Sequence, residues 1–361
     1  MARRIIVAAN REFATAPARL FVWRQSRRAV AAADGIRQMN TKNPFGGLVA
    51  GLGAGEFDML RSAVDERRCR GELGYGTLAE AAALYRPDPP CPSCSAPGAA
   101  RDGTSASGLR KYRCRACGAK FNSLTGTVFE GCKKDLPAWA SFVELMCWNV
   151  PVEAAAEIVG ISHKTAFEWR HRVFAAVSGY QDRLVLSGRV WLDETYVVDT
   201  DLSHGYGQAR KRGLSSQKLC VVVAIDERKT VVAKVCGHGK PSSARIRDVM
   251  LPHLAEGSTV VHDMEKSHAA LVRATGCRSE AYRADVRDPA YLECMALVNN
   301  LCSWLKRNLW RFTGMDPGNL QLYLDWYVYL FKVNQAKDRW PKVERVLRHL
   351  MMADARYRSL G

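Results

Sequence analysis

The sequence has no apolar run that approaches the roughly 20 residues of a membrane-spanning helix, and no sustained heptad repeat. The first absence argues against a membrane protein, so no membrane partner is expected, and the second gives no sign of a coiled coil. Acidic residues are scarce, because 36 Asp and Glu stand against 53 Lys and Arg, for a formal net charge of +17. This excess predicts a polyanionic partner, with nucleic acid favoured over an anionic membrane.

The chain is long enough for several domains, since it has 361 residues, of which 47% are hydrophobic. Its first 40 residues hold eight Arg and two acids, a composition found in transit peptides and basic arms. No periodic apolar pattern occupies this stretch, and Met39 is a second plausible start, so we interpret residues 1–38 as an upstream extension. Residues 1–54 are predicted to be a weakly ordered basic segment.

Two Cys-x-x-Cys pairs, Cys91-Pro-Ser-Cys94 and Cys114-Arg-Ala-Cys117, are separated by 19 residues. Two such knuckles can close a tetrahedron of four thiolates around Zn²⁺, and the alternative of two disulfides requires an oxidising compartment. The segments 111–114 and 117–121 are predicted to be two short strands around a knuckle. We therefore expect residues 87–130 to form a zinc ribbon with a structural Zn²⁺, because so small a unit needs the metal to fold.

The other eight cysteines are scattered singly, mostly among apolar residues. That distribution is typical of reduced core thiols, which predicts a cytoplasmic, nucleoid-associated protein.

Helical periodicity is clear on both sides of the ribbon. Residues 55–86 are predicted to form a short helical segment, and residues 131–182 three helices that end in a helix-turn-helix. In the third helix, Ala166, Trp169 and Val173 are expected to face the core. The exposed candidates for DNA contact are then Ser162, His163, Lys164 and Arg172. The alternative is an ordinary three-helix packing unit.

The pattern changes to strands after residue 188. We expect three strands that pair as a meander, followed by strands that need helical crossovers. The predicted strands are 189–198, 219–225, 230–235, 258–263 and 279–283, and the predicted helices are 242–254, 266–275, 291–312 and 319–333. Residues 336–361 are expected to be a basic C-terminal tail.

Two carboxylates stand out in this region. Asp193 lies within the apolar first strand, and Asp263 ends the fourth strand, where sites of open sheets form. A buried charge is costly unless it is paired or bound to a metal, so the two together suggest metal ligands, although either alone is more often a capping or ion-paired residue. Glu194 follows Asp193 on a strand and should face the opposite side of the sheet.

A third ligand is expected from the long helix that follows the fifth strand. Asn299 lies 36 positions after Asp263, and Lys306 lies two helical turns further along the same face. Asn300 is the adjacent alternative in register, and Glu293 is an alternative acid a turn and a half earlier.

This arrangement resembles the DDE transposases of insertion sequences that carry an N-terminal zinc ribbon. The matching motifs are residues 91–121, Trp191-Leu-Asp-Glu-Thr-Tyr196, Val261-His-Asp263 and the helix from Asn299 to Arg307. The resemblance covers residues 87–335 and departs from the commonest pattern in having Asn299 where Glu is usual. It implies an α+β and α/β multidomain protein, in which residues 185–335 form a ribonuclease H-like mixed five-stranded sheet flanked by helices.

The resemblance also implies a mechanism and partners. Asp193, Asp263 and Asn299 would hold catalytic Mg²⁺ or Mn²⁺ for strand cleavage and strand transfer, and Lys306 would contact a phosphate near the scissile bond. The partners would be double-stranded DNA, as terminal inverted repeats and as target, and further copies of the chain in a homo-oligomer on DNA. The basic residues Arg210, Lys211, Arg212 and Lys218 would contact flanking DNA, unless they form a solvated loop.

Two other functions remain open at this point. The chain could be a decayed transposase relative that binds DNA without cutting it, which Asn299 keeps plausible. It could also be a zinc-ribbon transcription regulator, although such a protein has no use for acids in buried strands.

Overall fold

The computed structural model describes residues 45–198, 218–312, 315–335 and 339–353. The chain divides into two compact units, Met1–Arg61 and Ser62–Gly361. Within the first unit lie helix α2 (Gly46–Ala50) and the beginning of α3 (Ala54–Leu73). The basic residues Arg210, Lys211 and Arg212, predicted to contact DNA, and residues 1–44 lie outside the described ranges. Among the described residues, no helix is both long enough and apolar enough to cross a membrane.

The segment around the four cysteines forms a small antiparallel sheet. Its strands are β1 (Ala100–Thr104), β2 (Arg110–Arg113) and β3 (Lys120–Asn122), in the order β1-β2-β3. The strands β2 and β3 were predicted, and β1 was not. The core of this sheet consists of the buried residues Cys91, Tyr112, Cys114 and Phe121, and the rings of Tyr112 and Phe121 stack at 5.5 Å.

Three helices follow the ribbon, as predicted: α5 (Leu136–Cys147), α6 (Val152–Val159) and α7 (His163–Val177). Asp135 caps α5, and Gly160 ends α6 in the left-handed conformation at φ 72°. Ser162 caps α7 by accepting a hydrogen bond from the Thr165 backbone N–H. Trp169 stacks on Trp139 with ring centroids 3.8 Å apart, which fixes α7 against α5.

The largest sheet has five strands in the order β6-β5-β4-β7-β8. Strand β4 pairs antiparallel with β5 and parallel with β7, while β5–β6 is antiparallel and β7–β8 parallel. The predicted mixed five-stranded sheet is therefore confirmed. The strands are β4 (Arg189–Val198), β5 (Lys218–Asp226), β6 (Val231–His238), β7 (Thr259–Asp263) and β8 (Arg278–Tyr282).

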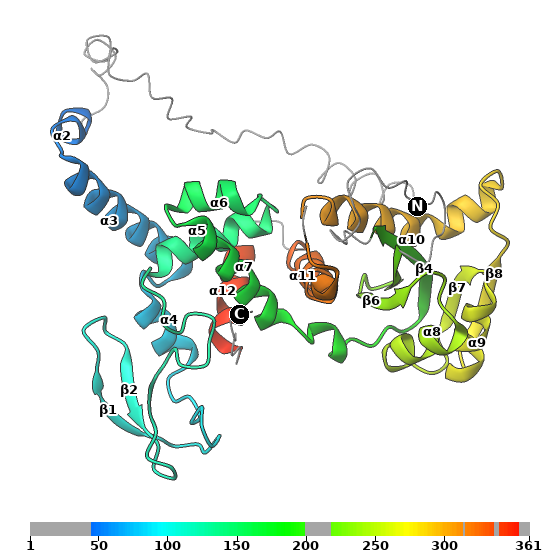
Figure 1. Ribbon diagram of the computed structural model, residues 1–361, viewed down its shortest axis with the longest axis horizontal. Helices are drawn as coiled ribbons and strands as arrows, with labels where there is room; N and C mark the ends of the chain where they lie inside the picture. Colours follow the sequence, from blue (N-terminus) through cyan, green and yellow to red (C-terminus); the bar gives the residue numbers. More distant parts are fainter. Residues whose placement is uncertain (1–44, 199–217, 313–314, 336–338, 354–361) are drawn as a thin grey trace, which may run out of the picture. The chain divides into compact units, whose positions relative to one another are not determined.

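Helices cover both faces of this sheet (Figure 1). On one face, α8 (Ser243–Met250) and α9 (Lys266–Thr275) pack on a core that contains Leu192, Val222 and Val260. On the other, α10 (Pro289–Leu309) and α11 (Leu320–Val333) pack on a core that contains Val221 and Val261. Because neighbouring strand residues alternate between faces, Asp193 points toward α10 and Glu194 toward α9.

The helical unit and the sheet unit share one core. Phe174 of α7 contacts Tyr323 and Trp326 of α11, with ring centroids 4.8 and 5.9 Å apart. Buried Gln181 lies between α7 and β4, and its amide donates to the Ala233 carbonyl and to Asp325. These contacts join segments that the sequence assigned to separate domains.

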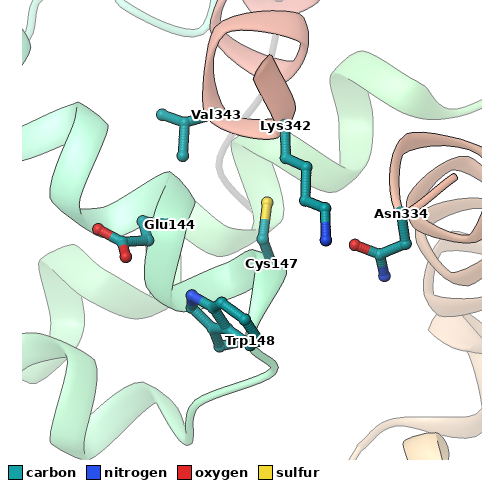
Figure 2. Close-up of a pocket in the computed structure, with 6 residues that line it drawn as sticks. All are labelled: Glu144, Cys147, Trp148, Asn334, Lys342 and Val343. Carbon is teal, nitrogen blue, oxygen red and sulfur yellow. The ribbon is translucent and has the colours of Figure 1, made fainter. Parts of the chain in front are cut away.

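The predicted basic C-terminal tail is wrong for most of its length. Residues Arg339–Met352 form helix α12, which buries Val343, Val346, Leu347 and Leu350. Lys342 and Val343 of α12 face Cys147 and Trp148 at the end of α5 (Figure 2). The apolar positions recur at helical spacing among the basic residues, so the segment packs as an amphipathic helix.

Candidate active site

Two sites were predicted, and the four-cysteine cluster is the first. The sulfur atoms of Cys91, Cys94, Cys114 and Cys117 all lie within 4.8 Å of one another. The sulfurs of Cys91 and Cys117 are 3.6 Å apart, as are those of Cys94 and Cys114, and all twelve cysteines of the chain are free thiols. Desolvation opposes ionisation of Cys91, but backbone N–H groups of Cys94 and Ser93 outweigh it and lower its pKa to about 6. Four convergent thiols of this kind are a donor set that suits tetrahedral Zn²⁺.

The predicted DNA contacts on α7 divide into two groups. Ser162, His163 and Lys164 are exposed, with the Ser162 hydroxyl engaged in capping the helix. Arg172 is not an exposed contact, because its guanidinium donates to the backbone carbonyls of Val128 and Glu130 at 3.1 and 3.0 Å. Arg172 therefore ties α7 to the segment after the ribbon, and it is half-buried instead of exposed as expected; its role as a DNA contact stays a prediction. Lys218, also predicted to contact DNA, is half-buried at the start of β5.

The carboxyl group of Asp193 lies where the strand pattern placed it, within β4 and on the face covered by α10. Its Oδ1 accepts a hydrogen bond from the Glu194 backbone N–H at 2.8 Å. Burial raises the pKa of Asp193 to about 7, and the nearby negative charges of Glu194 and Asp263 add to the effect. A bound cation would stabilise the ionised form of such a carboxyl group.

Asp263, at the end of β7, has a different environment. His268 of α9 places its Nδ1 2.9 Å from Asp263 Oδ1 and its Nε2 3.0 Å from Glu194 Oε1. Burial alone would raise the pKa of Asp263, but the contact with His268 outweighs it, and the pKa is lowered. Burial likewise opposes protonation of His268, but the two carboxylates raise its pKa to about 10, so the ring is a cation at neutral pH.

Sequence reasoning missed this Glu194–His268–Asp263 chain. It placed Glu194 correctly on the opposite face from Asp193, but it gave Glu194 no part in the site. The imidazole of His268 is fully buried and joins that face to the end of β7. The sequence feature that could have indicated this contact is a histidine, His268, in the first turn of the helix that follows Asp263.

Helix α10 carries the remaining predicted residues. Asn299 is half-buried and Lys306 is exposed. Two other residues of α10 have pKa values that the carboxylates affect. Burial raises the pKa of Tyr291, and the negative charges of Asp193 and Asp263 raise it further. Burial also raises the pKa of Cys302, and the charge of Asp193 adds to this effect. Glu293 is exposed.

Helix geometry relates Asn299 to these positions. Asn299 is one turn beyond buried Met295 and three residues before Cys302, so it borders the face that meets the sheet. Within the described residues the Asn299 side chain makes no hydrogen bond, and its amide oxygen is free to serve as a ligand. The indole N–H of Trp191 donates to the Cys294 carbonyl at 2.8 Å and fixes α10 against β4.

A second group of possible metal ligands comprises His262, Asp263 and His268. Both nitrogens of His262 are engaged, with the Asp263 carbonyl at 2.5 Å and with Ser279 Oγ at 3.0 Å. Both nitrogens of His268 face carboxylates, so neither ring offers a free lone pair. Of these three residues, only Asp263 therefore offers oxygen donors to a cation.

Comparisons with known proteins agree with this geometry. Residues 185–332 match the family model of the ISXO2-like transposase domain. The chain is 30% identical over 190 residues to "Uncharacterized protein in transposable element ISH50" of Halobacterium salinarum, an alignment that covers 48% of this chain. It spans 61% of the length of that relative.

Solved structures show only weak similarity. The simian T-cell lymphotropic virus intasome with the PP2A regulatory subunit B56 gamma aligns at 12% identity and a TM-score of 0.27, over 52% of this chain and 67% of that chain. The Mos1 mariner paired end complex with Mn aligns at 14% identity and a TM-score of 0.21, over 61% of this chain and 79% of that chain. TM-scores this low carry no conclusion about the present chain.

The family match includes both aspartates and the helix that bears Asn299 and Lys306. The similarity to an ISXO2-like transposase domain is confined to residues 185–332.

Proposed function

We propose that the chain is a DNA transposase that binds the terminal inverted repeats of an insertion sequence and catalyses metal-dependent strand cleavage and strand transfer. The observation that carries the proposal is the pair of half-buried aspartates on β4 and at the end of β7, two adjacent parallel strands. A net charge of +17 is consistent with DNA as the partner.

In this proposal Asp193, Asp263 and Asn299 hold Mg²⁺ or Mn²⁺, since oxygen donors select these ions. When bound, the ions would activate the attacking oxygen and stabilise the leaving oxygen of an in-line displacement at phosphorus. Two side chains of the protein itself take part. Asp193 takes part as a carboxylate after losing its proton, and the exposed ammonium of Lys306 contacts a phosphate of the DNA.

His268 acts as a positioning residue. Its imidazolium contacts Asp263 on one side and Glu194 on the other, which fixes the Asp263 carboxylate and keeps it ionised. Such outer contacts commonly set the orientation and basicity of a ligand. Glu194 then compensates the buried charge of His268 and does not itself reach the metal.

The four cysteines Cys91, Cys94, Cys114 and Cys117 would hold one structural Zn²⁺. The ribbon and the first turn of α7, with Ser162, His163 and Lys164, would contact the ends of the element. A homo-oligomer on DNA and a cytoplasmic location are parts of the same proposal.

Cleavage of the element's own ends tests the catalytic set. Asp193→Asn and Asp263→Asn should each lower the cleavage rate by about 100-fold or more while end binding persists, since each removes a group that stabilises transition-state charge. Asn299→Ala should lose much of the activity, and Asn299→Glu should retain or raise it by adding an anionic ligand. The rates are measured in Mg²⁺ and in Mn²⁺.

Glu293→Gln is the matched control and should be nearly silent, because Glu293 is exposed. If Glu293→Gln abolishes cleavage while Asn299→Ala spares it, the third ligand is misplaced by a turn and a half. Wild-type protein that binds ends but never cuts them would favour a second candidate function, a decayed relative that only binds DNA, for which the neutral Asn299 is the specific observation.

A further inference from the structure

A hollow of about 320 Å³ lies between α7 and the segment that joins α10 to α11. Its walls include Phe167, Arg170 and His171 of α7, and Phe312 and Tyr323 from the other side. It is separate from the four cysteines and from the two aspartates, and the functions proposed above do not use it.

Arg170 brings an unpaired charge to this hollow. Its guanidinium carbon lies 5.4 Å from the ring centroid of Phe167 and 5.4 Å from that of Phe312. Among the described residues it forms no ion pair with a carboxylate, and its buried Nε has no hydrogen-bond partner. Burial lowers the pKa of Arg170, as expected for a cation that lacks a counter-charge. Such a group is costly unless an anion reaches it.

His171 is a second buried polar side chain without a partner. It is 2% exposed, and neither ring nitrogen has a hydrogen-bond partner within the described residues. Burial lowers its pKa, and the charge of Arg170 lowers it further, so the neutral ring offers one N–H donor. Buried polar groups in native proteins are nearly always satisfied, so the unpaired ring is an unusual feature of the wall of the hollow, although both of its nitrogens are closed to solvent.

The rim of the hollow is mixed in charge. Glu153 and Asp316 are exposed acids, and Asp316 already accepts a hydrogen bond from the Gly318 backbone N–H at 2.8 Å. Arg311 is an exposed base on the same rim and donates to the Asn149 carbonyl at 3.3 Å. The rim thus has two acids and one base, and Arg170 is the one charged group of the lining that lies between two aromatic rings.

The position of the hollow relates it to the proposed DNA-binding surface. His163, in the first turn of α7, lines the same hollow, and Lys164 beside it is exposed. We propose that the hollow binds one backbone phosphate of the DNA that lies against α7, with the guanidinium of Arg170 as the donor. This inference rests on the proposed DNA-binding function and adds a phosphate site to it.

The test measures how the affinity of the full-length chain for a duplex carrying one end of its element depends on salt. Arg170→Met keeps the apolar stem between the two phenyl rings and removes the charge. It should weaken binding about tenfold at low salt and reduce the slope of log K against log[salt] by about 0.9, the value of one phosphate contact. Arg273→Met, an exposed arginine of α9, is the control and should leave the slope unchanged.

Duplexes in which single phosphates are replaced by neutral methylphosphonates locate the contact. Wild type should lose about tenfold affinity at one position, and Arg170→Met should lose nothing there. If Arg170→Met does not fold, Arg170→Lys, which keeps the charge but not the forked donors, should weaken binding less steeply at that same position. A folded Arg170→Met with an unchanged slope overturns the inference.

Thermal unfolding without DNA separates a binding role from a structural one. Arg170→Met should be at least as stable as wild type, because it removes an unpaired charge, and a large loss of stability with unchanged DNA affinity contradicts the proposal. Inorganic phosphate that stabilises wild type, combined with an unaltered DNA slope, would assign the hollow to a free anion instead. If wild type binds no duplex at all, both the proposed function and this inference are contradicted. If wild type binds and cleaves DNA, and Arg170→Met does so equally well, only this inference is contradicted.

Discussion

Asp193 illustrates how one buried carboxyl group can link stability to function. The apolar surroundings in β4 raise its pKa from 3.8 to about 7, so the folded protein holds a proton that the unfolded chain releases. Its contribution to stability is complete below pH 3.8 and is lost as the pH rises to about 7. A site that is less stable when ionised is one that a divalent cation can stabilise.

We therefore expect Asp193→Asn to stabilise the metal-free protein at pH 8, by up to about 4 kcal/mol, and to have little effect at pH 4. Chemical denaturation across this pH range, with Asp248→Asn as an exposed control, measures the difference. Added Mg²⁺ should stabilise wild type at pH 8 and not the variant. Equal stabilisation at both pH values would show that the carboxyl group does not carry this linkage.

His268 gives the second prediction for a single residue. His268→Gln keeps a polar side chain but removes the charge that faces Asp263, so the metal concentration for half-maximal cleavage should rise about 10–100-fold. Glu194→Gln should have a smaller effect, because Glu194 acts only through His268. His349→Gln in α12 is the control, and a loss of stability with an unaltered metal titration would make His268 merely structural.

The sequence allowed Asp193 and Asp263 to be predicted, because a charge inside an apolar strand and an acid at a strand end are both local patterns. The contact of Glu194 with His268 could not be predicted from the sequence, because it depends on how closely α9 packs against β4. Arg172 was expected to be exposed because its helical position leaves it off the core face of α7, but its guanidinium donates to the backbone carbonyls of Val128 and Glu130.

At the scale of elements, the ribbon sheet has very little core of its own. Two of its four buried core residues are cysteines of the cluster, so the stacked pair of Tyr112 and Phe121 depends on the thiols being held together. Strand β1 was missed because its residues Ala100–Thr104 are polar and mostly exposed, and backbone pairing with β2 alone defines it.

The ribbon should therefore unfold when its metal is removed. Freshly purified protein should contain about one Zn²⁺ per chain, and EDTA or Cys114→Ser should abolish the ordered signal of Tyr112 and Phe121. Cys277→Ser, which lies outside the cluster, should retain both the zinc and the signal. Metal analysis with near-ultraviolet circular dichroism makes the measurement, and a folded ribbon without zinc would refute the assignment.

Helix α12 shows the opposite case, an element that the sequence could have predicted. Its apolar residues Val343, Val346, Leu347 and Leu350 recur at the period of a helix. The basic composition of residues 336–361 concealed that pattern when the segment was taken as a whole. The contacts of α12 could not be predicted in this way, because nothing in its own sequence indicates that it packs on α4 (Leu78–Tyr85) and α5.

For residues 62–361 as a whole, the shared core makes the helical unit and the sheet unit depend on each other. Phe174 of α7 is fully buried among Tyr323, Trp326 and Phe312, which belong to the other part of the core. Sequence patterns predicted helices α5 to α7 and the strands and helices from β4 to α11, but could not show that one core would join them. A fragment limited to residues 185–335 would expose the apolar surface that α7 and α12 cover.

Phe174→Ala should accordingly lower stability by about 3–5 kcal/mol in both parts at once. Native-state hydrogen exchange should show amides of α7 and of β5 losing protection by the same free energy, because both open only in the common unfolding event. Leu84→Ala, an exposed position on α4, should change neither by more than about 0.5 kcal/mol. If α7 loses protection while β5 keeps it, the two parts unfold independently, and recognition of DNA and catalysis rest on separable domains after all.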